Sequence, residues 1–172
     1  MSTYGPFDEH LGPVKISDIT NKLWRPRDIA ERIDGVTVRQ IADLAERGII
    51  TPVIQAAGRG TSRIYDASGL YSIIIGLQAR SFLGHAETKG LIDFLLEVEA
   101  GEKPPIMCLL KKNLFEQEHG RFEIDVFSKD DKGNWDHDLF DGPWGPDPLL
   151  DGVRLLIHLH TIKYNLRLKF RY

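Results

Sequence analysis

Two short helical patterns separated by a tight turn constrain this chain more than any other feature. Pro26 suits the first position of a helix, and the apolar residues that follow it recur at helical spacing. Asp34-Gly35 ends this pattern. The next helix begins with a capping box, in which the Thr37 hydroxyl accepts from a backbone amide and Gln40 reaches back to the cap. Gly48 is expected to end this second helix in the left-handed conformation.

The next pattern along the chain predicts a β-hairpin and two further helices. Residues 51–55 and 62–65 are two short extended runs around a glycine-rich tip, which is typical of a hairpin. Asp66 is expected to cap a third helix that Gly84 ends, and a fourth helix is predicted over about 86–99. Helix, turn, helix, hairpin and two helices, in that order, predict a winged helix-turn-helix.

A change of pattern after Gly101 indicates a second module. Residues 106–111 and 121–128 are predicted strands, and the second alternates cleanly between apolar and polar positions. A third strand is predicted over 153–159. The expected fold class is therefore α+β, with the winged helix-turn-helix followed by a small antiparallel β-rich C-terminal module.

The end of this module is open to two interpretations. Residues 129–151 are rich in Asp, Gly, Pro and Trp and are predicted to form a long loop. The apolar phase changes at His160, which indicates either a bulge in one long strand or a terminal helix capped by Thr161. We favour the helix.

Composition limits the class of protein. The 172 residues suffice for one domain or two small ones, and we expect a weakly structured arm over 1–21, a domain over 22–101 and a module over 102–172. The longest apolar runs are far too short to span a membrane, and the first residues lack a signal-peptide pattern. The single cysteine, Cys108, excludes an internal disulfide and a zinc cluster of several cysteines. The cytoplasm is the expected location.

The net charge of −3 conceals an asymmetry along the chain. Residues 22–80 hold nine basic and six acidic side chains, whereas residues 101–152 hold six basic and twelve acidic ones. Residues 153–172 hold five basic side chains and none that is acidic. Segments of opposite charge suggest modules with different partners.

Residues 24–83, and less clearly those up to 100, resemble the DNA-binding domain of MerR-family transcriptional regulators. The resemblance rests on Arg27-Asp28-Ile29-Ala30, on the segments that open and close the second helix, and on Gly58–Asp66 with its Arg-x-Tyr followed by an acidic cap. It implies a transcriptional regulator that places the second helix in the major groove of operator DNA and the hairpin wing beside it.

The residue types at these positions suit contact with double-stranded DNA. Arg39 can bind guanine through two hydrogen bonds, and Gln40 can bind adenine, although capping is the favoured role for Gln40. Arg59 and Arg63 flank the hairpin tip, where they can contact phosphate or the minor groove. Tyr65 is expected to pack under the wing with its hydroxyl available to a phosphate. The complete set of predicted DNA-binding residues is Arg27, Thr37, Arg39, Gln40, Arg59, Thr61, Arg63 and Tyr65.

Residues 102–172 are expected to form a homodimer interface, because two linked half-sites multiply the weak affinity of one winged helix. A small-molecule effector is possible, but no motif supports it. Two alternatives remain, an excisionase-like architectural DNA-binding protein and a winged-helix module that binds other proteins. We predict no enzyme, no cofactor and no metal site, since His158 and His160 lack a third ligand at suitable spacing.

Overall fold

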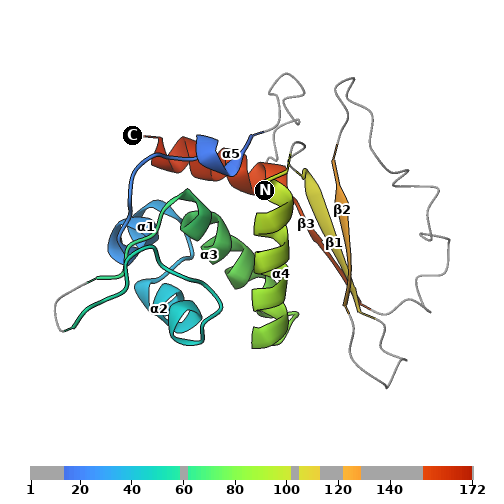
Figure 1. The fold of residues 1–172 in the computed structure, drawn as a ribbon, viewed down its shortest axis with the longest axis horizontal. Coiled ribbons are helices and arrows are strands. Elements are labelled where there is room, and N and C mark those ends of the chain that lie inside the picture. Colours follow the sequence, from blue (N-terminus) through green and yellow to red (C-terminus); the bar gives the residue numbers. More distant parts are fainter. Residues whose placement is uncertain (1–13, 59–61, 102–104, 113–121, 129–152, 172) are drawn as a thin grey trace.

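Among the described residues, four α-helices precede a small antiparallel sheet and a fifth follows it, which confirms the α+β class (Figure 1). The computed structural model describes residues 14–58, 62–101, 105–112, 122–128 and 153–171. The elements in these ranges are η1 (Ile16–Asp18), α1 (Pro26–Arg32), α2 (Val38–Glu46), α3 (Ala67–Ala79), α4 (His85–Glu99), β1 (Met107–Lys112), β2 (Phe122–Phe127), β3 (Val153–Ile157) and α5 (Leu159–Phe170).

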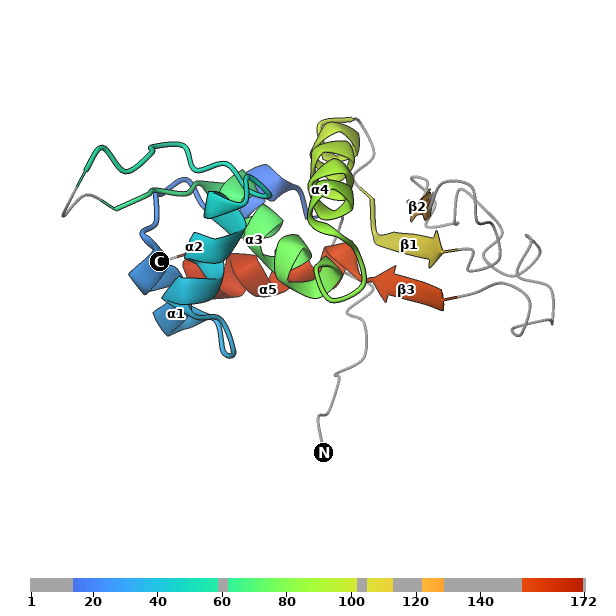
Figure 2. The ribbon, with the colours of Figure 1, turned by 90° about the horizontal axis from the view of Figure 1, so that it is seen from below.

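Helix α3 lies at the centre of the helical part. Nine of its thirteen residues are buried, including Leu70, Ile73 and Ile75. It contacts η1, α2, α4 and α5, and Figures 1 and 2 show α4 between α3 and the sheet. Because a helix buried on most sides requires apolar residues around its whole circumference, the sequence of α3 suits only this position.

The helix boundaries predicted at Pro26, Gly48 and Asp66 are confirmed. Pro26 is in the first turn of α1, and the side chain of Asp66 accepts a hydrogen bond from the Gly69 amide at 2.8 Å. Gly48 follows α2 with φ of 68°, the left-handed conformation that glycine adopts without steric cost. Gly84 does not end α3 as predicted. It is instead the N-cap of α4, where the Glu87 carboxylate accepts from its amide at 2.7 Å.

The predicted β-hairpin is reduced to one isolated bridge between Ile54 and Ile64. The amides of Val53 and Ile54 both donate to the same Ile64 carbonyl, at 2.8 and 3.4 Å. Two residues opposite one is the pairing of a bulge, which interrupts a ladder. A second bridge joins Trp24 to Tyr65, so three short segments run side by side at this place. Residues 59–61, at the tip, lie outside the described residues.

The three predicted strands form a sheet in the order β2-β1-β3, with both pairs antiparallel. Cys108 lies opposite Val126 on one side and Ile157 on the other. Cys108 and Ile157 are buried and belong to the same apolar cluster as α3 and α4. The helices therefore cover this face of the sheet.

The chain continues from β3 into α5, so the helical interpretation of its end is confirmed. The helix begins at Leu159 with His158 as its N-cap, and not at Thr161. The apolar phase changes at His160 because the chain passes from strand to helix within two residues. The predicted loop 129–151 lies outside the described residues.

Helix α5 packs beside α1, which lies far from it in the sequence (Figure 2). The rings of Trp24 and Phe170 meet edge to face at 4.9 Å, and the Arg32 guanidinium lies 4.7 Å from the Trp24 ring. Arg32 Nη1 donates to the Lys169 carbonyl at 2.8 Å, and Lys169 Nζ donates to the Arg32 carbonyl at 2.9 Å. Trp24 thus holds α5 against α1.

One apolar cluster contains residues from both sides of the boundary predicted near residue 101. Leu44 and Leu70 belong to it together with Cys108 and Phe170. The division into domains stays a prediction. Although weak structure was predicted for the whole of residues 1–21, Val14 and Ile19 are 3% and 0% exposed. Burial of two large apolar side chains holds the described part of this segment on the core. None of the described helices is long and apolar enough to cross a membrane.

A buried ion pair joins α5 to α4. Lys163 Nζ contacts Glu99 Oε1 at 2.6 Å, and each of the two side chains is 1% exposed. Lys163 also donates to the Pro105 carbonyl at 3.0 Å, and the Tyr71 hydroxyl donates to Glu99 at 3.3 Å. Burial and the neighbouring carboxylate raise the pKa of Tyr71, so its phenol keeps the proton that it donates.

Replacing Lys163 tests this pair. Lys163→Met retains most of the apolar length but leaves the Glu99 carboxylate buried without its cation, and we expect a loss of about 3–5 kcal/mol of unfolding free energy at neutral pH. Burial already raises the pKa of Glu99. The loss should therefore shrink as the pH falls, because Glu99 takes up a proton in the folded variant before it does so in the unfolded chain. Urea unfolding at a series of pH values measures both effects.

The double variant Glu99→Gln with Lys163→Met is the control for this experiment. It removes both charges and should recover much of the lost stability, because neither ion is then left unpaired in the interior. A single variant as stable as the wild type would contradict the role given to the pair.

Candidate nucleic-acid interface

The turn between α1 and α2 sets which side of α2 faces outward. Gly35 occupies this turn with φ of 78°, a backbone conformation that residues with a side chain rarely adopt. The α2 side chains Ile41 and Leu44 are fully buried with Ile29 of α1. Because residues three and four apart share one side of a helix, the intervening polar residues of α2 lie on its outer side.

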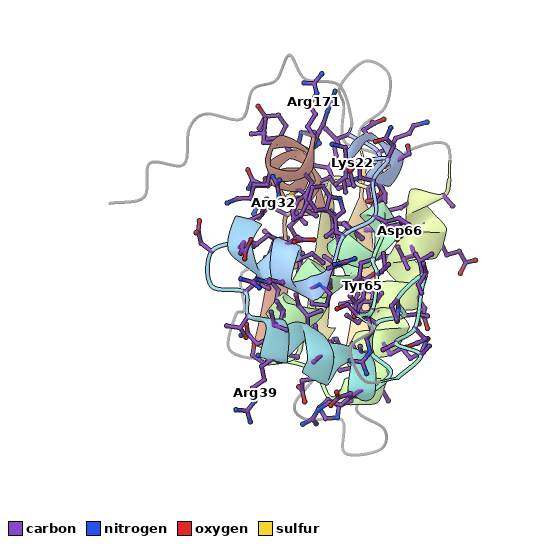
Figure 3. The ribbon with its side chains drawn as sticks, turned by 90° about the vertical axis from the view of Figure 1, so that its left-hand side faces the viewer. Lys22, Arg32, Arg39, Tyr65, Asp66 and Arg171 are labelled. Carbon is purple, nitrogen blue, oxygen red and sulfur yellow. The ribbon has the colours of Figure 1, made fainter. Side chains whose placement is uncertain are left out.

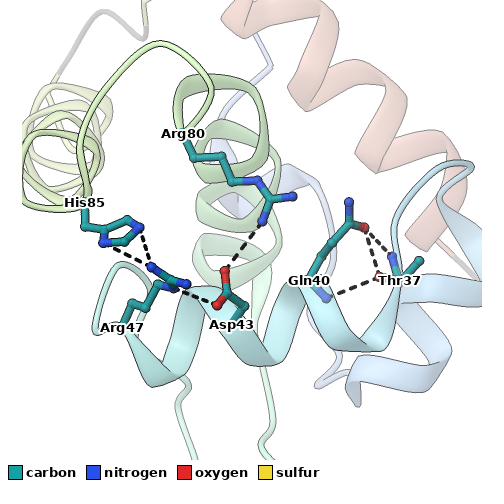
Figure 4. Close-up of polar contacts among 6 residues, drawn as sticks. All are labelled: Thr37, Gln40, Asp43, Arg47, Arg80 and His85. Atoms are coloured by element: carbon teal, nitrogen blue, oxygen red, sulfur yellow. Dashed lines mark hydrogen bonds and ion pairs between the residues drawn. The ribbon is translucent and has the colours of Figure 1, made fainter.

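The capping box predicted at the start of α2 is confirmed (Figure 4). The Gln40 amide donates to Thr37 Oγ1 at 3.2 Å, and the Thr37 amide donates to Gln40 Oε1 at 2.8 Å. The Thr37 hydroxyl also donates to Gln40 Oε1, at 3.1 Å. Gln40 therefore serves as a cap, the role that the sequence favoured. Its carbonyl oxygen is engaged, which leaves only its NH2 group for another partner.

Arg39 lies in the first turn of α2 with an exposed side chain. Within the part of the chain that the structure describes, this side chain has no hydrogen bond or ion pair. Figure 3 shows it projecting away from the ribbon at one end of the molecule. A guanidinium placed in this way can approach a large anionic partner without first breaking an internal contact.

Arg63 lies near the other end of α2. Its Nη1 is 3.6 Å from the Glu46 carboxylate, and the Arg63 side chain is 25% exposed. Residues seven apart in a helix lie on the same side, about 10 Å apart along its axis, so Arg39 and Glu46 share one side of α2. Arg63 is therefore associated with the side of α2 that carries Arg39, and Glu46 partly neutralises it.

The other predicted site residues differ in their accessibility. Arg27 is exposed on α1 and forms an ion pair with Glu31 at 3.0 Å. Arg59 and Thr61 lie outside the described residues.

Tyr65 does not present its hydroxyl to the surface, contrary to the prediction. The residue is 0% exposed, and the hydroxyl oxygen is buried without a hydrogen-bond partner among the described residues. Burial raises the pKa of Tyr65, which keeps the phenol protonated. Tyr65 belongs to the apolar core, and its backbone pairs with that of Trp24. Its burial in the core is therefore confirmed, and contact of its hydroxyl with a phosphate would require the side chain to move.

A charged cluster that the sequence analysis missed lies beside α2 (Figure 4). We define the Asp43 cluster as Asp43, Arg47, Arg80 and His85, which come from α2, the end of α3 and the start of α4. Asp43 contacts Arg47 at 2.6 Å and Arg80 at 3.7 Å, and the hydrogen bond from Arg47 lowers the pKa of Asp43. Arg47 Nη1 also lies 2.7 Å from His85 Nε2.

Only part of the Asp43 cluster has a signal in the sequence. Asp43 and Arg47 are four residues apart, the spacing of an ion pair within one helix. Arg80 and His85 reach them through the packing of α3 and α4, which no local pattern shows.

No protein-family model matches this sequence, and no curated protein is significantly similar to it. The identity of the candidate interface therefore rests on its residues and their geometry.

Substitution of the cap tests whether it holds the first turn of α2. Thr37→Ala removes the oxygen that accepts from the Gln40 amide, and we expect a loss of about 0.5–2 kcal/mol in the free energy of unfolding. Thr37→Ser is the matched control, since its hydroxyl can make the same bonds and should retain most of the stability. Thermal and urea unfolding measure both. Equal losses in the two variants would show that the hydroxyl is not what stabilises this turn.

Proposed function

We propose that this chain is a transcriptional regulator that binds double-stranded DNA through a winged helix-turn-helix formed by α1, α2 and residues 51–65. Helix α2 is the recognition helix in this proposal. One observation supports this proposal most strongly. The Arg39 side chain is exposed in the first turn of a capped helix and has no internal partner among the described residues. Recognition helices contact base edges with residues at this position.

Arg39 supplies direct recognition of the DNA sequence. Its planar guanidinium matches the two acceptors of guanine in the major groove, O6 and N7. Arg63, beside the other end of α2, is suited to phosphate, and Arg27 on α1 extends the positive charge. Arg59 and Thr61 are proposed to complete the wing. Thr37 and Gln40 act by holding the first turn in place.

The operator complex is proposed to contain two copies of the chain. One helix of nine residues reads only a few base pairs, and two copies bound to a palindrome multiply its affinity. Residues 102–172 remain the proposed dimer interface. Both a MerR-like regulator and an excisionase-like architectural protein would bind DNA in this way. A footprint over a promoter would favour the regulator, and a footprint over a recombination site would favour the architectural protein.

One observation favours a different class of function. Helix α2 carries the carboxylates Asp43 and Glu46 on its solvent-accessible surface, 40% and 67% exposed, and both oppose the approach of phosphate. A winged helix that binds another protein would tolerate them. Measured binding to DNA distinguishes the two classes.

Fluorescence anisotropy with a labelled random duplex tests DNA binding and the role of Arg39. We expect salt-dependent binding by the wild type, and weaker binding by Arg39→Ala. The matched control is Lys22→Ala, which removes an exposed cationic side chain that lies far from Arg39 in Figure 3 and outside the proposed dimer interface. This control should bind as the wild type does. If the wild type does not bind the duplex even at low salt, the proposed function is contradicted.

Selection of bound sequences from a random pool tests the recognition mechanism. The wild type should enrich a palindrome, and Arg39→Ala should lose the preference for guanine at one position of each half-site, worth about 1–3 kcal/mol. An unchanged enriched sequence would exclude base recognition by Arg39. Enrichment of single, unpaired sites would exclude the dimer.

A further inference from the structure

Arginines near the contact between α1 and α5 carry positive charge that no ion pair neutralises. Arg25, Arg32 and Arg171 are exposed, and within the part of the chain that the structure describes none of them forms an ion pair. Four arginines elsewhere each contact a carboxylate: Arg27, Arg47, Arg63 and Arg80. Unpaired guanidinium groups therefore gather at this contact.

Packing of two aromatic rings brings these arginines together. Trp24 and Phe170 meet edge to face with their ring centroids 4.9 Å apart, and Arg25 and Arg171 each follow one of these two residues in the chain. The Arg32 guanidinium lies 4.7 Å from the centroid of the Trp24 ring and 5.9 Å from that of the Phe170 ring. We define the α1–α5 patch as Arg25, Arg32, Lys169 and Arg171.

Two members of the α1–α5 patch hold the helices together. Arg32 and Lys169 each donate to the backbone carbonyl of the other, at 2.8 and 2.9 Å, and Lys169 Nζ also lies 3.5 Å from the Asp34 carboxylate. A guanidinium has five N–H donors, so Arg32 can donate to a second acceptor while it makes this contact. The helix contact therefore fixes two cations at the surface and leaves Arg32 able to bind an oxyanion.

The other two members are free to bind a partner. The side chains of Arg25 and Arg171 make no hydrogen bond among the described residues, although the Asp28 carboxylate accepts from the Arg25 backbone amide at 3.4 Å. Lys22 is not part of the patch, because it lines a groove beside Asp66. The contacts of the patch include two carboxylates, those of Asp28 and Asp34, against four cations, so the patch keeps positive charge that attracts anions.

The α1–α5 patch lies on the same side of the molecule as the proposed recognition helix. Figures 1 and 2 show α1, α2 and the C-terminal end of α5 on this side. In Figure 3, which views this side, Arg39 projects at one end and Arg32 and Arg171 lie towards the other. Because half-sites on a duplex lie about 34–36 Å apart, the DNA extends well beyond the nine residues of α2. Its phosphates are then available to cations that flank this helix.

We propose that the α1–α5 patch is a second DNA-binding surface, which contacts phosphates that flank the bases recognised by α2. The inference rests on the proposed function, because the partner is the same duplex. It assigns a role to cations of residues 153–172 that the recognition helix does not use. Phosphate contacts position a protein on DNA but carry no sequence information, so the patch should raise the affinity for every sequence. The dimer interface then lies elsewhere in residues 102–172.

Arg25 and Arg171 are the residues to replace, because neither side chain makes a contact that holds the fold together. The double variant Arg25→Gln with Arg171→Gln should unfold at the same temperature as the wild type. Each substitution should weaken binding to a 20-base-pair random duplex about two- to fivefold. Each should also make the dependence of log K on log salt less steep by about 0.9. The sequence enriched from a random pool should not change.

Lys89→Gln is the matched control for the loss of charge. It also removes one exposed cation, but it lies on α4, which α3 separates from α1 in Figure 1. This variant should bind the duplex as the wild type does. Because α5 lies within residues 102–172, light scattering should also show that the double variant has the same mass as the wild type.

The outcomes separate failure of the patch from failure of the proposed function. Equal affinity and equal salt dependence in the wild type and the double variant would overturn the patch and leave the proposed function intact. A double variant that loses the dimer would also overturn the patch, because Arg25 and Arg171 would then belong to the contact between copies. If the wild type binds no duplex at any salt concentration, the proposed function and the patch fail together.

Discussion

Burial of α3 determines how the other helices are arranged around it. Its apolar residues require cover from several sides, and α2, α4, α5 and η1 provide it. Helix α2 uses Ile41 and Leu44 for this contact and has no apolar stripe left for another partner. Its polar residues must then face outward, so the exposure of Arg39 follows from the way the core is formed.

Packing on the same core also creates the charged contacts between distant segments. When α4 packs against α3, His85 comes within reach of Arg47, and the end of α3 brings Arg80 to Asp43. When α5 packs on the other side, Lys163 meets Glu99 in the interior. The exposed cluster has a low cost of rearrangement because water can replace its contacts, whereas the buried pair holds two helices in one fixed relation.

Local chemistry explains which features the sequence could predict. The Thr37 capping box, the Asp66 cap and the left-handed Gly48 each depend on residues within four positions, and each is present. The predicted hairpin is reduced to one bridge, where Val53 and Ile54 share one carbonyl, a detail of pairing that alternation of residue types does not contain. Tyr65 was expected to keep an accessible hydroxyl, but its environment depends on Trp24, forty-one positions earlier in the chain. Contacts of this kind, including the Asp43 cluster, become visible only when the helices are placed in space.

Mapping of a DNA complex by nuclear magnetic resonance reports which surface of the protein meets the duplex, and not only whether a duplex binds. Backbone amide resonances would be followed as a 20-base-pair duplex is added at low salt. If α2 is the recognition helix, the shifts should concentrate in α2, from Thr37 to Arg47, and around Arg63. Shifts confined to the sheet or to α5, or no shifts at all, would contradict it.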